Sequence, residues 1–319
     1  MNLVDPEAAP DAAETPDAAD FRASEAFEII APARQTVPLV FASPHSGRAY
    51  PESFLNASRL DPVALRLSED AFVDELFADV VGLGAPLIRA LFPRAFIDVN
   101  REALELDPAM FEDALPDEVN TASPRVNAGL GTIARVVANG QEIYDHQLTF
   151  DEARRRIDSC YRPYHRALSA LIGKTAERFG GCVLVDCHSM PSSTPDQCKG
   201  IFNVVRGRTD GLGEPPVDMV IGDCWGSACA SKVSDALDAA ARGAGFLTRR
   251  NVPYAGGHTT RFYGRPANGV HAVQIEIRRD LYMDEKTITP HHGFDEVRGR
   301  IANLARTFAD AVSEIPGAG

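Results

Sequence analysis

Short apolar runs alternate along the chain with longer segments in which apolar residues recur every three or four positions. The short runs have the length of buried strands and predict them at residues 37–42, 85–88, 94–99, 181–187, 219–223 and 270–277. The longer segments predict amphipathic helices at residues 69–80, 150–179, 227–244 and 296–314. Strands that alternate with helices are typical of an α/β fold whose largely parallel sheet is covered on both faces.

Two of the predicted helices carry local signals at defined positions. Ser68 belongs to the residue types that cap helices, and it predicts that the first helix begins at Glu69. Pro163 lies inside the 150–179 segment and predicts an interruption of the helix there, because proline removes a backbone donor.

The first 24 residues differ in composition from the rest of the chain. They are rich in Ala, Pro, Asp and Glu and contain almost no large apolar residue, which predicts a disordered acidic tail over residues 1–24. The remainder contains no internal repeat and no linker rich in Pro, Gly or Ser. We therefore expect a single α/β domain over residues 25–319.

The overall charge narrows the classes of partner. With 32 Lys and Arg against 45 Asp and Glu, the chain carries a net charge of −13. Nucleic acids and anionic membranes require a basic surface, so we expect neither as a partner. No apolar run approaches the roughly 20 residues that span a bilayer. A small anionic substrate remains compatible with this charge, because a local cluster of Arg can override it. The sequence does not predict the oligomeric state.

The six cysteines favour a reducing compartment. No signal-peptide pattern opens the sequence, which predicts a cytoplasmic protein with free thiols. Cys224 and Cys229 are close in the sequence, but no further soft ligand is spaced for a structural zinc site. We therefore expect the cysteines to act as small buried hydrophobic residues.

Polar residues lie near the ends of several predicted strands, where ligands bind in open α/β sheets. They are His45, Glu69, Asp70, Asn100, Arg101, His188 and Glu276. Two imidazoles and one carboxylate leave an open position on a tetrahedral zinc ion, and the same set suits Fe(II), Mn(II) or Co(II). A second carboxylate can act as general base. Arg can bind a substrate carboxylate or an oxyanion.

Most of these residues also have a purely structural explanation. The two histidines could be loop residues with satisfied hydrogen bonds, and Arg101 could pair with a neighbouring carboxylate. Glu69 and Asp70 could serve only as first-turn charges that favour the helix dipole. Glu276 differs from them because it is flanked by apolar residues of a predicted buried strand. A carboxylate in such a strand is costly unless it is paired or functional.

Six segments together resemble the N-formylglutamate amidohydrolase family. In chain order they are Ser43-Pro44-His45-Ser46-Gly47-Arg48, Ser68-Glu69-Asp70-Ala71-Phe72-Val73-Asp74-Glu75-Leu76-Phe77, Asp98-Val99-Asn100-Arg101, Asp186-Cys187-His188-Ser189-Met190-Pro191, Gly256-Gly257-His258-Thr259-Thr260-Arg261-Phe262-Tyr263-Gly264 and Gln274-Ile275-Glu276-Ile277. They occur in the order in which the family has them, and they span residues 43–277, which is most of the expected domain.

The resemblance implies a fold and a metal site. The fold is a three-layer αβα arrangement with a mixed, largely parallel central sheet, similar to zinc-dependent exopeptidases and phosphorylase/hydrolase-like proteins. His45 and His188 match zinc ligands, and Asp70 matches the third ligand, with the adjacent Glu69 as its competitor. Glu276 matches the position of the general base.

The resemblance also implies contacts with the substrate. Arg101 is expected to stabilise the oxyanion, and Asn100 is similar to an amide that related enzymes use on a substrate carboxylate or carbonyl. Arg261 is expected to hold a side-chain carboxylate. Ser46 and Arg48, in the first matching segment, are expected to contribute to substrate binding.

The reaction that the resemblance implies is hydrolysis of N-formyl-L-glutamate to formate and L-glutamate, a step of histidine breakdown. The substrate would be a small anionic N-acyl amino acid. A zinc hydrolase of the same fold that acts on a larger N-acyl amino acid, or on a peptide or cell-wall amide, is the alternative, because it would keep the same zinc residues. A binding protein without turnover would need no base beside an open metal position.

Overall fold

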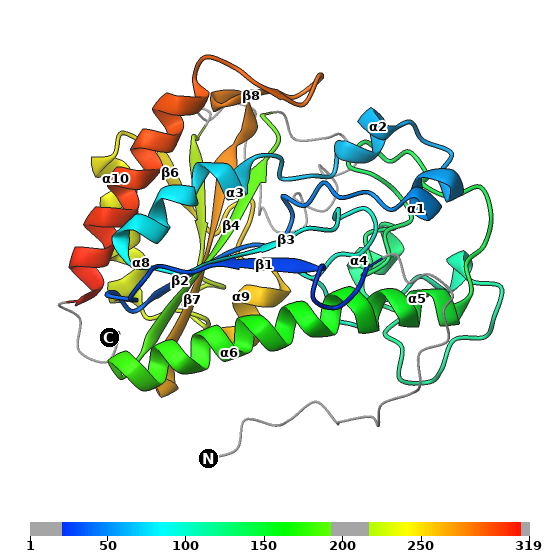
Figure 1. The fold of residues 1–319 in the computed structure, drawn as a ribbon, viewed down its shortest axis with the longest axis horizontal. Coiled ribbons are helices and arrows are strands. Elements are labelled where there is room, and N and C mark those ends of the chain that lie inside the picture. Colours follow the sequence, from blue (N-terminus) through cyan, green and yellow to red (C-terminus); the bar gives the residue numbers. More distant parts are fainter. Residues whose placement is uncertain (1–20, 193–216, 314–319) are drawn as a thin grey trace, which may run out of the picture.

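The computed structural model describes residues 21–192 and 217–313, which form a seven-stranded sheet between layers of helices (Figure 1). The strands, in the order in which they lie in the sheet, are β1 (Phe27–Ile30), β3 (Leu87–Ala90), β2 (Leu39–Ser43), β4 (Cys182–Met190), β7 (Val270–Arg278), β5 (Met219–Gly222) and β6 (Thr248–Arg250). Neighbours from β3 to β7 are parallel, as are β5 and β6, whereas β1–β3 and β7–β5 are antiparallel. The mixed sheet confirms the expected fold class.

Helices cover both faces of the sheet. One layer contains α3 (Val73–Leu76), the 3-10 helix η1 (Ala78–Leu83), α8 (Ser231–Gly243) and α10 (Phe294–Ser313). The other layer contains α5 (Phe150–Arg156), α6 (Arg162–Phe179) and α9 (His258–Tyr263). The remaining elements lie in connections: α1 (Glu52–Ala57), α2 (Pro62–Arg66), η2 (Pro108–Met110), α4 (Pro124–Asn127), η4 (Pro266–Asn268), η5 (Arg279–Leu281), β8 (Met283–Asp284) and β9 (Thr289–Pro290).

The central strands send alternate side chains into two separate cores. Odd-numbered residues of β4 and β7, such as Val185 and Ile275, pack with α3, α8 and α10. Even-numbered residues at the start of the same strands, such as Leu184 and Ala272, pack with α6. Further along, this second face becomes polar, at Asp186, His188, Gln274 and Glu276. The second core therefore ends where a group of buried polar side chains begins.

Most of the predicted elements are confirmed. The strands expected at residues 37–42, 85–88, 181–187, 219–223 and 270–277 correspond to β2, β3, β4, β5 and β7, and the helices expected at 227–244 and 296–314 correspond to α8 and α10. His188 lies inside β4 rather than after it. The short elements β1, β6 and α9 were not predicted, because none of them contains a continuous apolar run.

The predicted strand at residues 94–99 is wrong. The backbone forms turns there: Phe96 N donates to Pro93 O at 3.0 Å, and Asn100 N donates to the Asp98 carboxylate at 2.8 Å. These local hydrogen bonds satisfy the backbone without a neighbouring strand. The apolar side chains are nevertheless buried, so the hydrophobic run indicated burial correctly and secondary structure incorrectly.

The first predicted helix begins later than expected. It starts with α3, four residues after Glu69, and the Ser68 hydroxyl does not cap it but accepts a hydrogen bond from the backbone N–H of Ala138 at 3.2 Å. The backbone N–H of Asp70 donates to His45 O at 3.0 Å. This contact fixes the segment before the helix against the loop that follows β2.

The segment 150–179 is helical throughout, and its hydrogen bonding changes in the middle. A π-helical stretch, Ile157–Tyr161, joins α5 to α6, and Pro163 follows it in the first turn of α6, where a missing N–H is tolerated. Such stretches are frequent at functional sites. This one carries Tyr161, whose hydroxyl donates to Arg101 O at 2.7 Å.

The expected acidic tail lies mostly outside the described residues. Of its last four residues, Phe21 is buried and packs against Phe92 and Phe96, with ring centroids 6.0 and 5.8 Å away. Five cysteines are free in the described part of the chain, and Cys198 lies outside it. Within residues 21–192 and 217–313, no helix is long and apolar enough to cross a membrane.

Candidate metal centre

Three buried side chains from separate segments meet at one carboxylate oxygen. They are His45, Asp70 and His188, which we call the metal centre. Asp70 Oδ2 lies 3.2 Å from His45 Nδ1 and 2.9 Å from His188 Nδ1. One possible ligand atom from each of the three lies within 4.8 Å of the others. All three side chains are buried. Two imidazole nitrogens and one carboxylate in this arrangement could hold a divalent metal ion.

Backbone and hydroxyl contacts fix the first two residues of the metal centre. The hydroxyl of Ser46 donates to Asp70 O at 3.0 Å and lies 2.6 Å from that of Ser43. Together with the hydrogen bond from Asp70 N to His45 O, this contact joins the loop after β2 to the segment before α3. These contacts hold the segment that carries Asp70 at the end of β2.

Each histidine turns its second ring nitrogen to another buried carboxylate. His45 Nε2 lies 2.8 Å from Asp98 Oδ1, and His188 Nε2 lies 3.0 Å from Asp186 Oδ1. Carboxylates in this position orient metal-binding imidazoles and fix which nitrogen carries the proton. Burial disfavours the charged form of Asp98, but Arg101, Arg94 and His45 outweigh it and hold its pKa well below the usual range.

The surroundings of His188 fit a metal at its Nδ1. Asp186 Oδ1 is buried and has no hydrogen-bond donor in good geometry within residues 21–192 and 217–313. The amide nitrogen of Asn100 instead lies 3.1 Å from His188 Nε2. A metal at Nδ1 requires the proton on Nε2, where it would face Asp186 Oδ1. The unsatisfied Asp186 oxygen therefore lies beside the ring nitrogen that would carry this proton.

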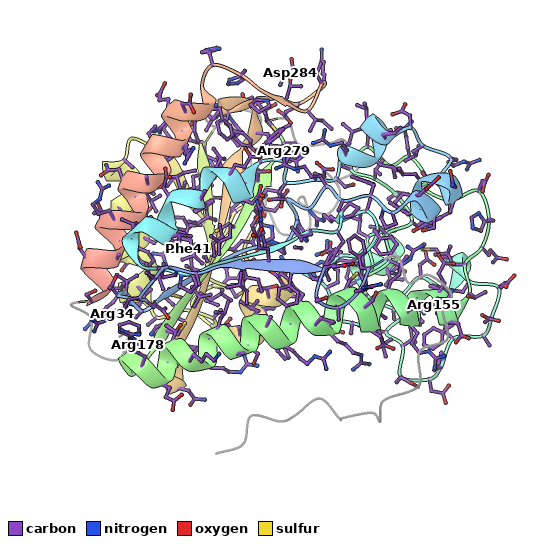
Figure 2. All side chains as sticks on the ribbon, viewed as in Figure 1. Arg34, Phe41, Arg155, Arg178, Arg279 and Asp284 are labelled. Carbon is purple, nitrogen blue, oxygen red and sulfur yellow. The ribbon has the colours of Figure 1, made fainter. Side chains whose placement is uncertain are left out.

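The other oxygen of Asp70 faces a buried arginine. Arg279, which directly follows β7, is labelled among the side chains in Figure 2. It donates from Nη2 to Asp70 Oδ1 at 2.9 Å and from Nε to Ser189 Oγ at 3.0 Å. Burial disfavours ionisation of Asp70, but its contacts with the two histidines outweigh it and hold its pKa well below the usual range. Asp70 is therefore ionised at neutral pH, as a metal ligand must be.

Glu276 lies beside the metal centre, opposite His188 in the parallel pairing of β4 and β7. Its pKa is raised to about 7, chiefly because it is buried and also because Asp70 is negative, while His188 opposes the shift. Gln274 donates from Nε2 to Glu276 Oε1 at 2.7 Å. A carboxyl group with such a pKa can accept and return protons near neutral pH.

Glu69, the competitor of Asp70 in the sequence, is engaged elsewhere. Its carboxylate accepts a hydrogen bond from the Tyr50 hydroxyl at 2.7 Å and from Arg66 Nε at 3.1 Å. The structure therefore places Asp70, and not Glu69, with the two histidines.

Two further predicted residues, Asn100 and Arg101, lie next to the metal centre and are largely occupied by protein groups. Asn100 Oδ1 accepts from Thr259 N at 2.8 Å, in addition to the contact of its amide nitrogen with His188. Arg101 donates to Leu130 O at 2.9 Å and to Asn100 O at 2.8 Å. Its Nη2 also lies 3.5 Å from Asp98 Oδ2, so Arg101 does pair with a neighbouring carboxylate, and contact of its remaining N–H groups with a substrate stays a prediction.

The three other predicted substrate residues have different surroundings. The Ser46 hydroxyl is used within the protein, as described above. Arg48 is exposed, pairs with Glu75 at 2.6 Å and lies over the Phe72 ring. Arg261 lies on α9 and donates to Gly256 O at 3.0 Å. Contact of these residues with a substrate stays a prediction.

Four residues around the metal centre were not assigned a role from the sequence: Asp98, Asp186, Gln274 and Arg279. Asp186 did carry a signal, because a residue two positions before His188 in a strand points to the same face. Gln274 carried the same signal, two positions before Glu276, whereas Asp98 lies in a turn and Arg279 reaches Asp70 across more than two hundred residues, so these two had none.

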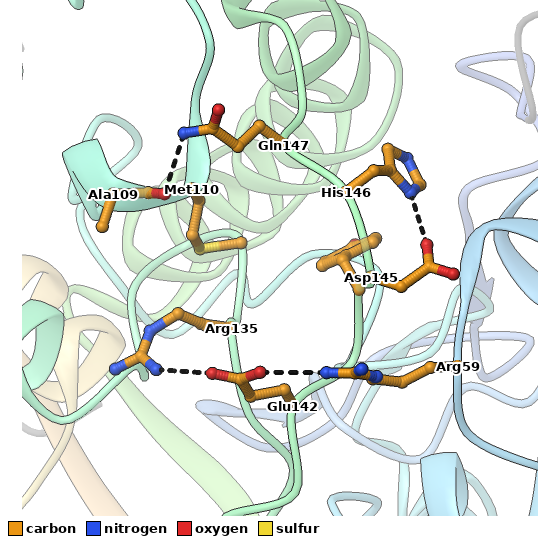
Figure 3. Close-up of a pocket in the computed structure, with 9 residues that line it drawn as sticks. Arg59, Ala109, Met110, Arg135, Glu142, Asp145, His146 and Gln147 are labelled. Atoms are coloured by element: carbon orange, nitrogen blue, oxygen red, sulfur yellow. Dashed lines mark hydrogen bonds and ion pairs between the residues drawn. The ribbon is translucent and has the colours of Figure 1, made fainter.

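A second polar region is the charged hollow, a surface depression of ≈ 250 Å³ lined by Arg59, Ala109, Met110, Arg135, Glu142, Tyr144, Asp145, His146 and Gln147 (Figure 3). Its charges are paired with each other: Glu142 lies 3.1 Å from Arg59 and 3.4 Å from Arg135, and His146 lies 2.9 Å from Asp145. The hollow therefore presents satisfied ion pairs rather than a set of converging ligands.

Known proteins resemble this chain over most of its length. A sequence profile of the N-formylglutamate amidohydrolase family matches residues 37–283. N-formylglutamate deformylase from Pseudomonas aeruginosa is 26% identical over 264 residues, covering 81% of this chain and 87% of that protein. The deformylase from Pseudomonas putida is 27% identical over 252 residues, covering 78% and 83%. The crystal structure of N-formylglutamate amidohydrolase from Ralstonia eutropha superposes with a TM-score of 0.80 at 34% identity, covering 89% of this chain and 97% of that one.

Proposed function

Because the chain belongs to the N-formylglutamate amidohydrolase family, we propose that it hydrolyses N-formyl-L-glutamate to formate and L-glutamate with a zinc ion. The observation that carries this proposal is the position of Glu276 beside a cluster of two histidines and one aspartate. Such a cluster provides three protein ligands and an open position, and the adjacent carboxyl group provides a base.

His45, Asp70 and His188 would hold the metal. Nitrogen and oxygen ligands in this number suit zinc, and other divalent ions accept the same set. When bound there, a divalent ion supplies Lewis acidity for the formyl carbonyl and for the attacking water. Asp98 and Asp186 would keep the protons of both imidazoles on Nε2, so that each Nδ1 presents its lone pair to the metal.

Glu276 would move the protons of the reaction. Its carboxylate accepts a proton from the attacking water, and its carboxylic acid then donates that proton to the departing amine of glutamate. A pKa of about 7 makes both transfers possible at neutral pH, because neither form is strongly favoured. The hydrogen bond from Gln274 orients the carboxylate for these transfers.

Arg101 and Asn100 would act on the polar groups of the substrate. Asn100 contacts His188, and the N–H groups of Arg101 that its contacts with Leu130, Asn100 and Asp98 leave over could stabilise negative charge on the carbonyl oxygen. Arg261 would bind a carboxylate of the substrate.

The test combines metal analysis with an assay of the purified protein. We expect about one zinc per chain by elemental analysis, and formate release from N-formyl-L-glutamate that is lost on chelation and restored by zinc. Zinc without formate release would reject this substrate and direct the assay to larger N-acyl amino acids. A protein that neither binds metal nor turns over substrate after zinc is added would overturn the proposal.

A further inference from the structure

Two arginines on segments beside the metal centre, the half-buried Arg125 and the exposed Arg261, form no ion pair with a carboxylate in residues 21–192 or 217–313, whereas other half-buried arginines do. Arg66 pairs with Glu69, Arg94 with Asp98, and Arg135 with Asp107 and Glu142, for example. Arg125 forms no side-chain hydrogen bond and no ion pair with any residue in 21–192 or 217–313, although it is half-buried. Arg261 has only the carbonyl oxygen of Gly256 as a partner in the same residues.

The segments that carry these two arginines are fixed to adjacent residues beside the metal centre. Arg125 lies on α4, and Leu130 N donates to Arg125 O at 2.8 Å, while Leu130 O accepts from Arg101 Nε at 2.9 Å. Arg261 lies on α9, whose Thr259 N donates to Asn100 Oδ1 at 2.8 Å. α4 and α9 therefore converge on Asn100 and Arg101.

The positive charges of Arg125 and Arg261 act on each other and on His258. The pKa of Arg125 is lowered, first by burial and then by the positive charge of Arg261. The pKa of His258 is lowered by burial, and Arg125 and Arg261 both contribute to that shift. Glu105 opposes the shift of Arg125, but its carboxylate accepts a hydrogen bond from Ser123 and forms no ion pair with Arg125.

The half-buried Arg125 loses hydration that no ion pair within the protein replaces, and the positive charge of Arg261 disfavours its charged form further, so an anionic ligand would stabilise both groups. Asn100 contacts His188, so the segments that carry the two arginines are linked to the metal centre through Asn100 and its neighbour Arg101. We propose that Arg125, together with Arg261, binds the side-chain carboxylate of the substrate and so makes the enzyme specific for acidic amino acids. This inference rests on the proposed function for the identity of the reacting amide, and it adds Arg125 as a residue that determines specificity.

The decisive experiment compares two substrates that differ only in the distal group. N-formyl-L-glutamate carries a carboxylate there, and N-formyl-L-glutamine carries a neutral amide of nearly the same size. For Arg125→Gln we expect kcat/KM with N-formyl-L-glutamate to fall by about 10- to 100-fold, the loss of one charge-assisted hydrogen bond. Activity with N-formyl-L-glutamine should change by less than about threefold, because no charged contact is lost with it.

Matched variants separate this role from a structural one. Arg125→Lys keeps the charge and should restore part of the preference for the acidic substrate. Arg135→Gln removes a half-buried arginine of the charged hollow and should leave both substrates unaffected. Zinc content should equal that of the wild type in all three variants. Equal losses with both substrates in Arg125→Gln would overturn the proposal, since Arg125 would then bind a group that the two substrates share.

A binding measurement separates failure of this inference from failure of the proposed function. Glutarate is a dicarboxylate without an amide, and it can be titrated into the zinc-loaded protein by calorimetry. If the wild type releases no formate, the proposed function fails, but weaker binding of glutarate to Arg125→Gln by about tenfold or more would still support the carboxylate site. Equal binding of glutarate to both proteins would reject it.

Discussion

The metal centre and the charged hollow contain the same kinds of side chain, but they differ in burial and in pairing. His45, Asp70 and His188 are each at most 3% exposed, and one oxygen atom contacts both imidazoles. In the hollow, the side chains of Arg59, Glu142 and His146 are about half exposed, at 49%, 51% and 49%. Arg59 and Glu142 pair with each other at the surface, and His146 contacts the Asp145 carboxylate there.

This difference favours ligand binding in the buried region over the exposed one. Removing charged groups from water is costly, and a protein that does so gains little stability from the pairs it forms. Ligand-binding chemistry is a reason to retain such groups. Exposed ion pairs cost little to form and contribute little, because water and salt screen them. The following variants test that contrast, beginning with the largest expected effect.

The largest effect is expected from removal of a metal ligand. His188→Ala removes one of three protein ligands, so we expect the zinc content to fall well below one per chain. Formate release should fall by more than about 100-fold, which exceeds the usual effect of removing a residue that only hydrogen-bonds a metal ligand. Elemental analysis and a formate assay measure both. His146→Ala, in the charged hollow, is the matched control and should retain zinc and activity. A fully metallated His188→Ala variant would remove this residue from the centre.

Removal of the base should separate metal binding from turnover. Glu276→Gln keeps the shape of the side chain but cannot accept a proton, so we expect zinc to be retained and kcat to fall by about 10²- to 10⁴-fold. The same substitution in the hollow, Glu142→Gln, should change kcat by less than twofold. Wild-type turnover in Glu276→Gln would exclude Glu276 from the proton transfers.

The pH dependence of activity should report the environment of Glu276. Because burial raises the pKa of this group to about 7, its carboxylate form is present above that pH and is lost below it. We expect kcat/KM to fall as the pH is lowered through 7, approaching about tenfold per unit. A pH–rate profile of the wild type measures this, with Glu276→Gln as its control. Persistence of the same acidic limb in that variant would assign it to another group.

A smaller effect is expected from the outer partner of His188. Asp186→Asn removes the charge that faces Nε2 and weakens the preference for the tautomer that binds metal, so zinc affinity should fall by about 10- to 100-fold. Competition with a chelator of known affinity gives the dissociation constant. Asp145→Asn alters the carboxylate that pairs with His146 in the hollow and should leave it unchanged. If both variants bind zinc like the wild type, Asp186 has no role in holding the metal.

The fold was predictable where a run of apolar residues marks a buried strand or helix, because a buried backbone must form the regular hydrogen bonds of such an element. β4 and β7 lie at the centre of the sheet and are rich in apolar residues, and both were predicted. Prediction failed where local hydrogen bonds decide the backbone, as at residues 94–99, where the Asp98 side chain takes the N–H of Asn100. It also failed for β1 and β6, whose partly exposed side chains leave no apolar run.

The site was predictable as a set of residues but not as a network. His45, Asp70 and His188 were named from their positions near strand ends and from the family resemblance, and they meet in space. The choice between Asp70 and Glu69 needed the structure, because adjacent residues on one turn differ only in where their side chains point. Arg125 had no signal at all, since its relation to Arg261 arises from tertiary packing.

The smallest effect is expected in the charged hollow itself. Glu142→Ala removes the carboxylate that joins Arg59 and Arg135, but all three side chains are at least one-third exposed. We therefore expect the free energy of unfolding to change by no more than about 1 kcal/mol in a denaturant titration, and less in high salt. Zinc content and turnover should not change. A much larger loss of stability, or a loss of activity, would mean that the hollow is coupled to the metal centre. The contrast between the paired charges of the surface and the buried groups of the metal centre would then no longer hold.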